Sequence, residues 1–322
     1  MSIEYRNLGD SGLRVSTIGL GCNNFGRPGT ATEGQEGTTA VIHAALDAGV
    51  TLFDTADVYG YAFGRSETMM GAALEGRRDE IVLATKFGHA DFDSPIASGG
   101  AKASRRYVRL AVEGSLRRLR TDWIDLYQLH TPDPFTPIEE TLDVLDDLVR
   151  EGKVRYIGHS NLAGWQIVEA EFSARIAGHP RFISAQNEYS LLARDVEREV
   201  LPAVRAFGLG FLPYFPLHNG LFTGKFSRAG GPSDSRIMRQ RPHILENAPW
   251  DIVEEYERML ESWGVSMLEG TFGWLLAQPA LTSVIAGATT PEQVRQNAAA
   301  AAAWTPSPEQ VDAISRLFST SS

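Results

Sequence analysis

The sequence predicts an α/β protein folded as a (β/α)8 barrel, and three observations support that fold class. Eight short runs rich in Ile, Val, Leu, Phe and Tyr alternate with longer stretches of helical periodicity along the 322 residues. Most runs are apolar throughout, which is typical of parallel strands buried on both faces. Eight such units in a chain of this length fit a closed barrel better than an open sheet, and the glycine fingerprints of the common nucleotide-binding open sheets are missing.

Each predicted strand is an apolar run bounded by Gly, Asp or Pro. In chain order the predicted strands are 16–21, 51–56, 81–86, 124–130, 154–161, 183–189, 210–217 and 283–288. No composition shift or linker interrupts this series. We therefore expect one domain spanning residues 1–322.

The predicted helices lie between the strands and begin and end at recognisable residues. They are 36–48, 66–75, 104–119, 137–151, 163–177, 195–207, 251–262 with 266–277, and 291–303, followed by one extra C-terminal helix from Pro308. Ser104 is placed as an N-cap, Pro137 in a first turn, and Gly152 just after a helix end. The segment 218–250, rich in Gly, Pro, Ser and Arg, is predicted as a long loop over the C-terminal face of the barrel, where active sites lie.

Composition narrows the class of partner. The formal net charge of −10 argues against nucleic acid or an anionic membrane surface as the main partner. Cys22 is the one cysteine, so an intramolecular disulfide and a cluster of zinc-bound thiolates are both excluded, and no metal site is expected. With no apolar leader at the N-terminus and no apolar run of membrane-spanning length, we expect a cytoplasmic protein that acts on a small molecule.

Four ionisable residues stand at or just after the ends of consecutive predicted strands: Asp54, Tyr59, Lys86 and His130. Taken singly, each has an ordinary structural explanation as a helix cap, a surface cation or a packed imidazole. In a parallel barrel, however, these strand ends meet at one rim. Their convergence therefore favours a functional site over four separate accidents.

Together these four side chains suit the protonation of a developing alkoxide. A tyrosine hydroxyl ordinarily has a pKa of about 10, and the ammonium of Lys86 is expected to lower the pKa of Tyr59. Asp54 would hold Lys86 through a salt bridge, and His130 would hydrogen-bond the substrate oxygen. Without a metal-ligand cluster, the substrate would be activated by hydrogen bonding.

Several blocks of the sequence resemble the aldo-keto reductase superfamily, in the order in which that family has them. The blocks are FDTADVYG (53–60), ATKFG (84–88), LYQLH (126–130), GKVRYIGHSN (152–161), QNEYSLL (186–192) and SVIAGATTPEQVRQN (283–297). The opening, YRNLGDSGLRVSTIGLG (5–21), is most similar to the branch of bacterial reductases and potassium-channel β-subunits.

This resemblance implies a (β/α)8 barrel that reduces aldehydes or ketones with NADPH, or with NADH. It assigns Tyr59 as the general acid, Lys86 and Asp54 as the residues that tune it, and His130 as the residue that orients the carbonyl. Phe25, after the first strand, is the best candidate for a substrate contact.

The resemblance also implies a set of cofactor contacts around the same rim. Ser160, Asn161 and Gln186 would bind the nicotinamide carboxamide, and Tyr214 would stack on the ring. The remaining contacts would be Leu217, Gly220, Leu221 and Lys225 over the pyrophosphate, and Gly287, Thr289, Gln293, Gln296 and Asn297 at the adenosine end.

Departures from the family pattern leave some features open. Thr289 stands where a basic residue is common, so Arg295 or an arginine from 236–241 would have to contact the 2′-phosphate of NADPH, and the choice between NADPH and NADH stays open. His159, Phe215 and His218 also differ from the usual residues, and they either reshape the pocket or only pack locally.

Two other functions fit parts of the same sequence. One is a nicotinamide-binding regulatory subunit that turns over slowly, because channel-associated relatives keep the four residues. The other is a phosphate-binding barrel isomerase or aldolase, in which Lys86 would form a Schiff base. The substrate, the physiological direction and the oligomeric state are not determined by the sequence.

Overall fold

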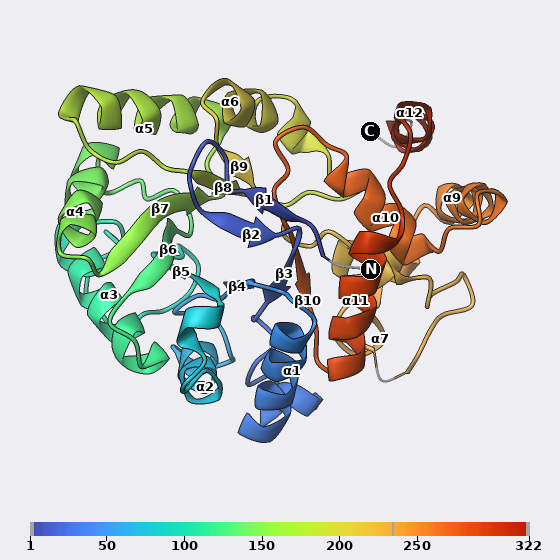
Figure 1. Cartoon of the computed structure of the whole chain (residues 1–322), viewed down its shortest axis with the longest axis horizontal. Helices are drawn as coiled ribbons and strands as arrows, with labels where there is room; N and C mark the ends of the chain where they lie inside the picture. Colours follow the sequence, from blue (N-terminus) through green and yellow to red (C-terminus); the bar gives the residue numbers. More distant parts are fainter. Residues whose placement is uncertain (1–2, 234, 320–322) are drawn as a thin grey trace.

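The structure is a computed structural model that describes residues 3–233 and 235–319. Its main sheet has eight parallel strands in the order β10-β3-β4-β5-β6-β7-β8-β9. They are β3 (Ile18–Gly21), β4 (Leu52–Asp54), β5 (Val82–Phe87), β6 (Ile124–Leu129), β7 (Val154–Ser160), β8 (Ser184–Gln186), β9 (Gly210–Phe211) and β10 (Val284–Gly287). Figure 1 shows the sheet curled around a central axis.

The two ends of the curled sheet are joined next to β9 and β10. The amide of Phe211 donates to the carbonyl of Ala280 at 2.8 Å, and the amide of Ile285 donates to the carbonyl of Pro213 at 3.2 Å. With these bonds the sheet closes on itself, which confirms the predicted barrel.

Helices surround the sheet on its outer side (Figure 1). The main ones are α1 (Gln35–Asp47), α2 (Arg65–Ala73), α3 (Arg105–Leu119), α4 (Ile138–Arg150), α5 (Gly164–Ala177), α6 (Val200–Ala206), α9 (Trp250–Ser262), α10 (Met267–Leu276), α11 (Pro291–Ala303) and α12 (Pro308–Leu317). Ser104 caps α3 by accepting a hydrogen bond from the amide of Tyr107, as its position predicts. The extra C-terminal helix is α12.

The predicted strands are all present, but most are shorter than the apolar runs that predicted them. The seventh run, 210–217, keeps only the two residues of β9 as a strand. Pro213 and Pro216 lie in the rest of that run and have no amide hydrogen to donate to a sheet. Its second half is therefore free to follow an irregular path over the rim.

A hairpin that sequence analysis did not assign closes the N-terminal end of the barrel. It consists of β1 (Tyr5–Asn7) and β2 (Arg14–Ser16), paired antiparallel. Leu8 and Val15 are fully buried against apolar side chains from inside the barrel, including Leu52 and Leu126. Because this end is filled with apolar side chains, the polar side chains inside the barrel gather at the opposite end.

The segment 218–250 is less irregular than the predicted loop. It contains the short helices η4 (His218–Thr223), α7 (Arg236–Gln240) and α8 (His243–Glu246). Ser235 caps α7, because its hydroxyl oxygen accepts a hydrogen bond from the amide of Met238. Across the part of the chain that the structure describes, no helix combines the length and the apolar character needed to span a membrane.

Candidate active site

The register of the parallel strands brings the predicted polar residues to one rim. Gly21 at the end of β3 pairs with Asp54 at the end of β4, and Lys86 near the end of β5 pairs with Gln128 of β6. Ser160 ends β7 beside Gln186, which ends β8. The C-terminal ends of these strands therefore form the candidate site, as the barrel fold requires.

The centre of the site is a buried ion pair. Lys86 Nζ donates to Asp54 Oδ2 at 2.6 Å and to the carbonyl oxygen of Thr55 at 2.9 Å. The other carboxylate oxygen, Asp54 Oδ1, accepts from Gln128 Nε2 at 3.2 Å and from Gln186 Nε2 at 3.0 Å. Both charges are almost completely withdrawn from solvent, but each is compensated by hydrogen bonds.

The ion pair with Asp54 affects the protonation state of Lys86. Burial alone lowers the pKa of an ammonium, but the carboxylate of Asp54 and the phenol of Tyr59 together raise the pKa of Lys86 above its usual range. Lys86 is therefore an ammonium at neutral pH. A Schiff base requires a neutral amine, so the state of Lys86 disfavours the aldolase alternative.

Tyr59 lies in the loop after β4, beside both Lys86 and His130. Lys86 Nζ is 5.1 Å from the centre of the Tyr59 ring, and the Tyr59 and His130 rings meet edge to face with centroids 5.7 Å apart. Burial raises the pKa of Tyr59 above 10, and this outweighs the opposite effect of Lys86. Lys86 lowers the pKa of Tyr59 as expected, but desolvation is the larger influence, so the net shift in the free protein is upward and the phenol stays protonated.

His130 directly follows β6 and is neutral. Burial, reinforced by the charge of Lys86, keeps the pKa of His130 well below 6.5. Its Nδ1 atom is buried without a hydrogen-bond partner among the described residues. A neutral imidazole next to a protonated phenol can donate or accept a hydrogen bond without adding a charge to the site.

His89 and Gln128 belong to the site, although sequence analysis did not select them. The His89 ring lies 4.4 Å from the His130 ring, centroid to centroid, and Gln128 binds Asp54. His89 comes three residues after Lys86, and Gln128 comes two before His130. His89 directly follows the block ATKFG and Gln128 lies within the block LYQLH, and these positions were the available signal. The directions of the two side chains could not be predicted from the sequence.

The residues predicted to bind the nicotinamide carboxamide form one connected group. Ser160 Oγ donates to the carbonyl oxygen of Gln186 at 2.7 Å, and Asn161 Nδ2 donates to the carbonyl oxygen of His130 at 2.9 Å. Tyr214 Oη donates to Asn161 Oδ1 at 2.9 Å. These bonds tie Tyr214 and Asn161 to the backbone of His130, so the predicted cofactor residues adjoin the four central ones.

The residues predicted over the pyrophosphate lie in and around η4. Leu217 precedes it, Leu221 is buried, and Lys225 is exposed. Gly220 has φ 111°, in the region that favours glycine. The chain thus makes a tight turn between the site and Lys225.

The residues predicted at the adenosine end lie at the start of α11. Gln293 Oε1 accepts hydrogen bonds from the backbone amide of Thr289 at 2.8 Å and from its hydroxyl at 3.2 Å. Gly287 leaves room for Asn24, because a Cβ there would lie 2.8 Å from Asn24 Nδ2. Gln296 is exposed and Asn297 is half-buried on the same helix.

Four other residues named in the sequence analysis have these positions: Phe25, His159, Phe215 and His218. Phe25 is fully buried, so a substrate contact by Phe25 stays a prediction. His159 is fully buried, neither of its ring nitrogens bonds to a described residue, and burial lowers its pKa to about 3. The ring of Phe215 meets the ring of Tyr214 edge to face at 5.2 Å, and His218 follows with φ 46°.

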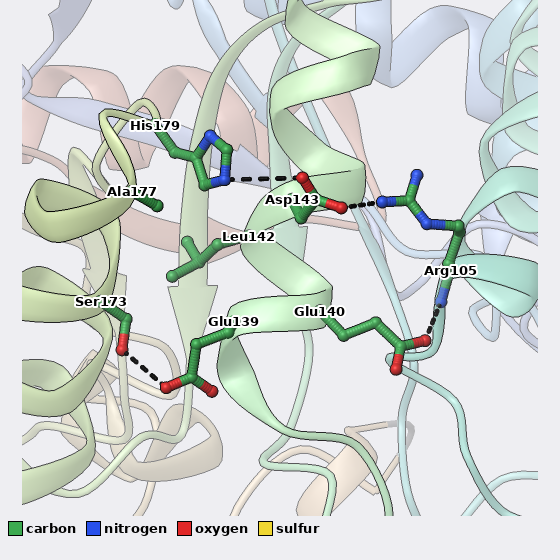
Figure 2. A pocket seen from close by; sticks show the side chains of 8 residues that line it. All are labelled: Arg105, Glu139, Glu140, Leu142, Asp143, Ser173, Ala177 and His179. Atoms are coloured by element: carbon green, nitrogen blue, oxygen red, sulfur yellow. Dashed lines mark hydrogen bonds and ion pairs between the residues drawn. The ribbon is translucent and has the colours of Figure 1, made fainter.

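A separate pocket lies on the outside of the barrel, among α3, α4 and α5 (Figure 2). It is lined by Arg105, Glu139, Glu140, Leu142, Asp143, Ser173, Ala177 and His179. The figure shows its polar groups engaged with one another, for example Ser173 with Glu139 and Arg105 with Asp143. None of the residues predicted for the active site line it. Within residues 3–233 and 235–319, no group of three or more His, Cys, Asp or Glu side chains is arranged to hold a metal ion.

Comparisons with known proteins identify the family of the chain. The sequence model described as "Aldo/keto reductase family" matches residues 17–318. An uncharacterized oxidoreductase, YrpG, of Bacillus subtilis (strain 168) is 38% identical over 91% of this chain and 89% of its own. A probable voltage-gated potassium channel subunit beta of Oryza sativa subsp. japonica is 34% identical, over 92% and 90%. The versiconal hemiacetal acetate reductase of Aspergillus parasiticus is 33% identical, over 91% and 90%.

Proposed function

The chain belongs to the aldo/keto reductase family, and from that premise we propose that it reduces small aldehydes or ketones to alcohols, with Tyr59 supplying the proton. As a member of this family the chain is an oxidoreductase, and proteins of the family generally use NAD(P)H. One observation supports the finer assignment most strongly. The buried Lys86–Asp54 pair lies beside a protonated tyrosine and a neutral histidine at a single rim.

The residues around Tyr214 fit a nicotinamide. Asn161 Oδ1 accepts one hydrogen bond, from Tyr214, and a carbonyl oxygen can accept a second. Gln186 Nε2 uses one of its two hydrogens on Asp54. The oxygen of a carboxamide can accept from the free hydrogen of Gln186, and one of its two N–H groups can donate to Asn161 Oδ1. The partly exposed Tyr214 ring offers a flat surface for stacking.

When bound, NADPH or NADH supplies the hydride for the carbonyl carbon. The protein contributes the rest. Tyr59 and His130 hold the carbonyl oxygen by hydrogen bonds, which polarises the carbonyl group and fixes its position. As negative charge grows on that oxygen, the Tyr59 hydroxyl donates its proton to it, and the ammonium of Lys86 stabilises the resulting phenolate.

Asp54 has a positioning role in this scheme. Its carboxylate keeps Lys86 charged and fixed, and the amides of Gln128 and Gln186 hold the carboxylate in turn. Gln186 is also one of the proposed carboxamide contacts. The acid and the cofactor site are therefore joined by one set of hydrogen bonds, which orients them toward the same space.

The direct test is Tyr59→Phe, assayed with NADPH or NADH and aldehydes such as 4-nitrobenzaldehyde and methylglyoxal. Because the variant lacks the acidic hydroxyl but keeps the ring, kcat should fall by about 10²- to 10⁴-fold, the usual contribution of a general acid. Cofactor affinity, followed by quenching of tryptophan fluorescence, should stay close to that of the unmodified protein.

Tyr5→Phe is the matched control. It removes the same atom from a tyrosine of the β1–β2 hairpin, at the closed end of the barrel, where Tyr5 Oη binds the carbonyl of Gly49. Its kcat should be unchanged. Unaltered turnover in Tyr59→Phe would disprove the assignment of the acid.

A second candidate function is a nicotinamide-binding regulatory subunit with slow turnover. It is favoured by the similarity to probable potassium channel β-subunits of rice and Arabidopsis thaliana, which are 34% and 33% identical to this chain. Single-turnover and steady-state rates separate the two. If bound NADPH is oxidised once at a useful rate but repeated turnover is very slow with every aldehyde tested, the regulatory function is favoured.

A further inference from the structure

His89 lies at the rim of the candidate active site and has no part in the reaction proposed above. It comes two residues after the end of β5, and its ring meets the His130 ring edge to face with centroids 4.4 Å apart. It also meets the ring of Phe92 edge to face, at 4.6 Å. Phe92 is 51% exposed, so these three rings form a row that leads from His130 to the surface.

The backbone fixes the position of the hydrogen on the His89 ring. The amide of Asp91 donates to His89 Nδ1 at 3.2 Å. Burial lowers the pKa of His89 below its usual range, so the imidazole is neutral at neutral pH. A neutral imidazole carries one hydrogen, and because Nδ1 accepts a hydrogen bond, that hydrogen is on Nε2. His89 Nε2 is therefore a donor.

This donor is open to a ligand. No hydrogen bond among residues 3–233 and 235–319 uses His89 Nε2, and the atom is not one of the buried side-chain atoms left without a partner, so solvent reaches it. The same holds for Nε2 of His130, whereas Nδ1 of His130 is buried. Two neighbouring imidazoles therefore each present one accessible nitrogen at the rim.

A lysine holds the loop that carries His89. Lys102 Nζ donates to three backbone carbonyl oxygens of this loop, those of His89, Ala90 and Phe92, at 2.9, 2.9 and 2.7 Å. The amide of Ala90 donates to Thr131 Oγ1 at 2.9 Å, which ties the loop to the segment after β6. His89 is thus fixed relative to His130 before a substrate binds, as a preorganised contact requires.

We propose that His89 is a substrate-binding residue that determines specificity, because its Nε2–H donates a hydrogen bond to an oxygen on the carbon next to the reacting carbonyl. The inference rests on the proposed function, in which Tyr59 and His130 hold the reacting oxygen. Two oxygens on neighbouring carbons then meet two neighbouring rings, each oxygen beside one imidazole.

The chemistry of the donor indicates the class of substrate. A carbonyl oxygen accepts hydrogen bonds and has no hydrogen of its own, whereas a hydroxyl would bring a hydrogen that needs a further acceptor. The group that best matches His89 Nε2–H is therefore a second carbonyl. The preferred substrates are small 1,2-dicarbonyl compounds.

A purely structural role for His89 is the competing explanation. Packing against His130 and Phe92 requires only a ring of suitable size, and an apolar ring would serve equally well. A hydrogen fixed on Nε2 and left accessible adds nothing to such packing. These two features favour a binding role.

The test compares 2,3-hexanedione with 2-hexanone, which share a carbon skeleton and differ in one oxygen, using the full-length protein, NADPH and a borate-free buffer. In His89→Leu the donor is lost, so the ratio of the two kcat/KM values, dione over monoketone, should fall about tenfold, the upper range for one neutral hydrogen bond. The difference in intrinsic reactivity between the two ketones is the same for both proteins and cancels in this comparison.

Two further variants make the result specific. The amide of His89→Gln can still donate, so this variant should recover much of the preference. His43→Leu is the control, because His43 is a half-buried histidine of α1 whose Nε2 lies 3.2 Å from the carbonyl oxygen of Ala73, and its loss should leave the ratio unaltered. An unaltered ratio in His89→Leu, whether both rates fall together or neither changes, would overturn the proposal.

A binding measurement separates failure of this inference from failure of the proposed reaction. The NADP⁺-loaded protein has no hydride to give, so calorimetric titration with the two ketones requires no turnover. Tighter binding of the dione, lost in His89→Leu, supports the role of His89 even if neither ketone is reduced. Equal binding of the two ketones contradicts it even if Tyr59-dependent reduction of other aldehydes is observed.

Discussion

Lys86 and Arg27 are both buried cations beside the same rim, but the protein treats them in opposite ways. Lys86 has the carboxylate of Asp54 at 2.6 Å and the carbonyl of Thr55 at 2.9 Å. Arg27, in the loop after β3, has neither an ion pair nor a side-chain hydrogen bond to any described residue. The charge of Lys86 is neutralised by a carboxylate within the protein, whereas the guanidinium of Arg27 has no such counter-charge among the described residues.

The difference indicates that the two cations have different roles. A compensated ammonium can tune Tyr59 in every state of the protein. An uncompensated guanidinium, which does not release its proton near neutral pH, favours whichever anion reaches it. His159 is a third kind of buried basic group. Its imidazole has no hydrogen-bond partner among the described residues, and it stays neutral.

Breaking the Lys86–Asp54 ion pair should have the largest effect on stability and on turnover. Lys86→Met leaves the carboxylate of Asp54 buried without its cation, so the free energy of unfolding should fall by about 3–5 kcal/mol. Turnover should fall by about 10²-fold or more, because the phenolate of Tyr59 loses its neighbouring charge. Urea unfolding and steady-state kinetics measure the two effects.

Lys153→Met is the control for this change. Lys153 is a partly exposed lysine paired with Glu113 and Glu151, so its loss should cost no more than about 1 kcal/mol. If Lys86→Met is as stable and as active as this control, the buried pair does not have the role given to it here.

His159 should make the protein sensitive to acid. Its pKa is about 3 in the folded state and about 6.5 when unfolded, so between these values the unfolded chain binds a proton that the folded chain does not. The stability contribution is complete above pH 6.5 and is lost as the pH falls toward 3. At pH 4 the loss is about 3 kcal/mol, at 1.36 kcal/mol per pKa unit.

The variant His159→Leu should remove most of this acid-induced loss, measured as unfolding free energy at pH 7 and pH 4. His243→Leu, at an exposed position, should leave the loss in place. An unchanged slope in His159→Leu would show that other groups cause the acid sensitivity.

The pH dependence of reduction tests the state of the acid. Because burial raises the pKa of Tyr59 above 10 and keeps that of His130 well below 6.5, kcat/KM for reduction should be flat between about pH 6.5 and 9 and should fall only at higher pH, as the phenol loses its proton. Stopped-flow rates across this range check it. A midpoint near pH 8 would mean that the ammonium of Lys86 outweighs burial once the cofactor is bound.

The smallest expected effect has the opposite sign from the first. Arg27→Met removes a buried cation that forms no ion pair with residues 3–233 or 235–319, so the free energy of unfolding should rise by about 1 kcal/mol. Arg118→Met removes a guanidinium bound to Glu67 and should lower it. Thermal unfolding of the two variants, compared without added anions, decides whether the unpaired arginine is a cost in the free protein. A lower stability in both would refute that claim.

Much of the fold was predictable because hydrophobic periodicity is a local property. The eight apolar runs led to the eight strands, and Ser104 marked the start of α3 correctly. The β1–β2 hairpin was not predicted because a three-residue strand is too short to show a hydrophobic period. The short helices of 218–250 were not predicted for a related reason, since each is only four to six residues long.

The central residues of the site were predictable because parallel strands bring their ends to one rim. The sign of the Tyr59 pKa shift was not, because it depends on how completely the phenol is desolvated. His89 was missed for a similar reason. Its place beside His130 depends on the direction in which a loop side chain points, and the sequence does not determine that direction.

A crystal structure of the protein with NADP⁺ and 4-(hydroxymethyl)benzoate tests the proposed function most directly. The account predicts the alcohol oxygen within hydrogen-bonding distance of Tyr59 and His130, and the nicotinamide carboxamide in contact with Asn161 and Gln186. An alcohol oxygen far from Tyr59, or a nicotinamide bound away from Asn161 and Gln186, would contradict it.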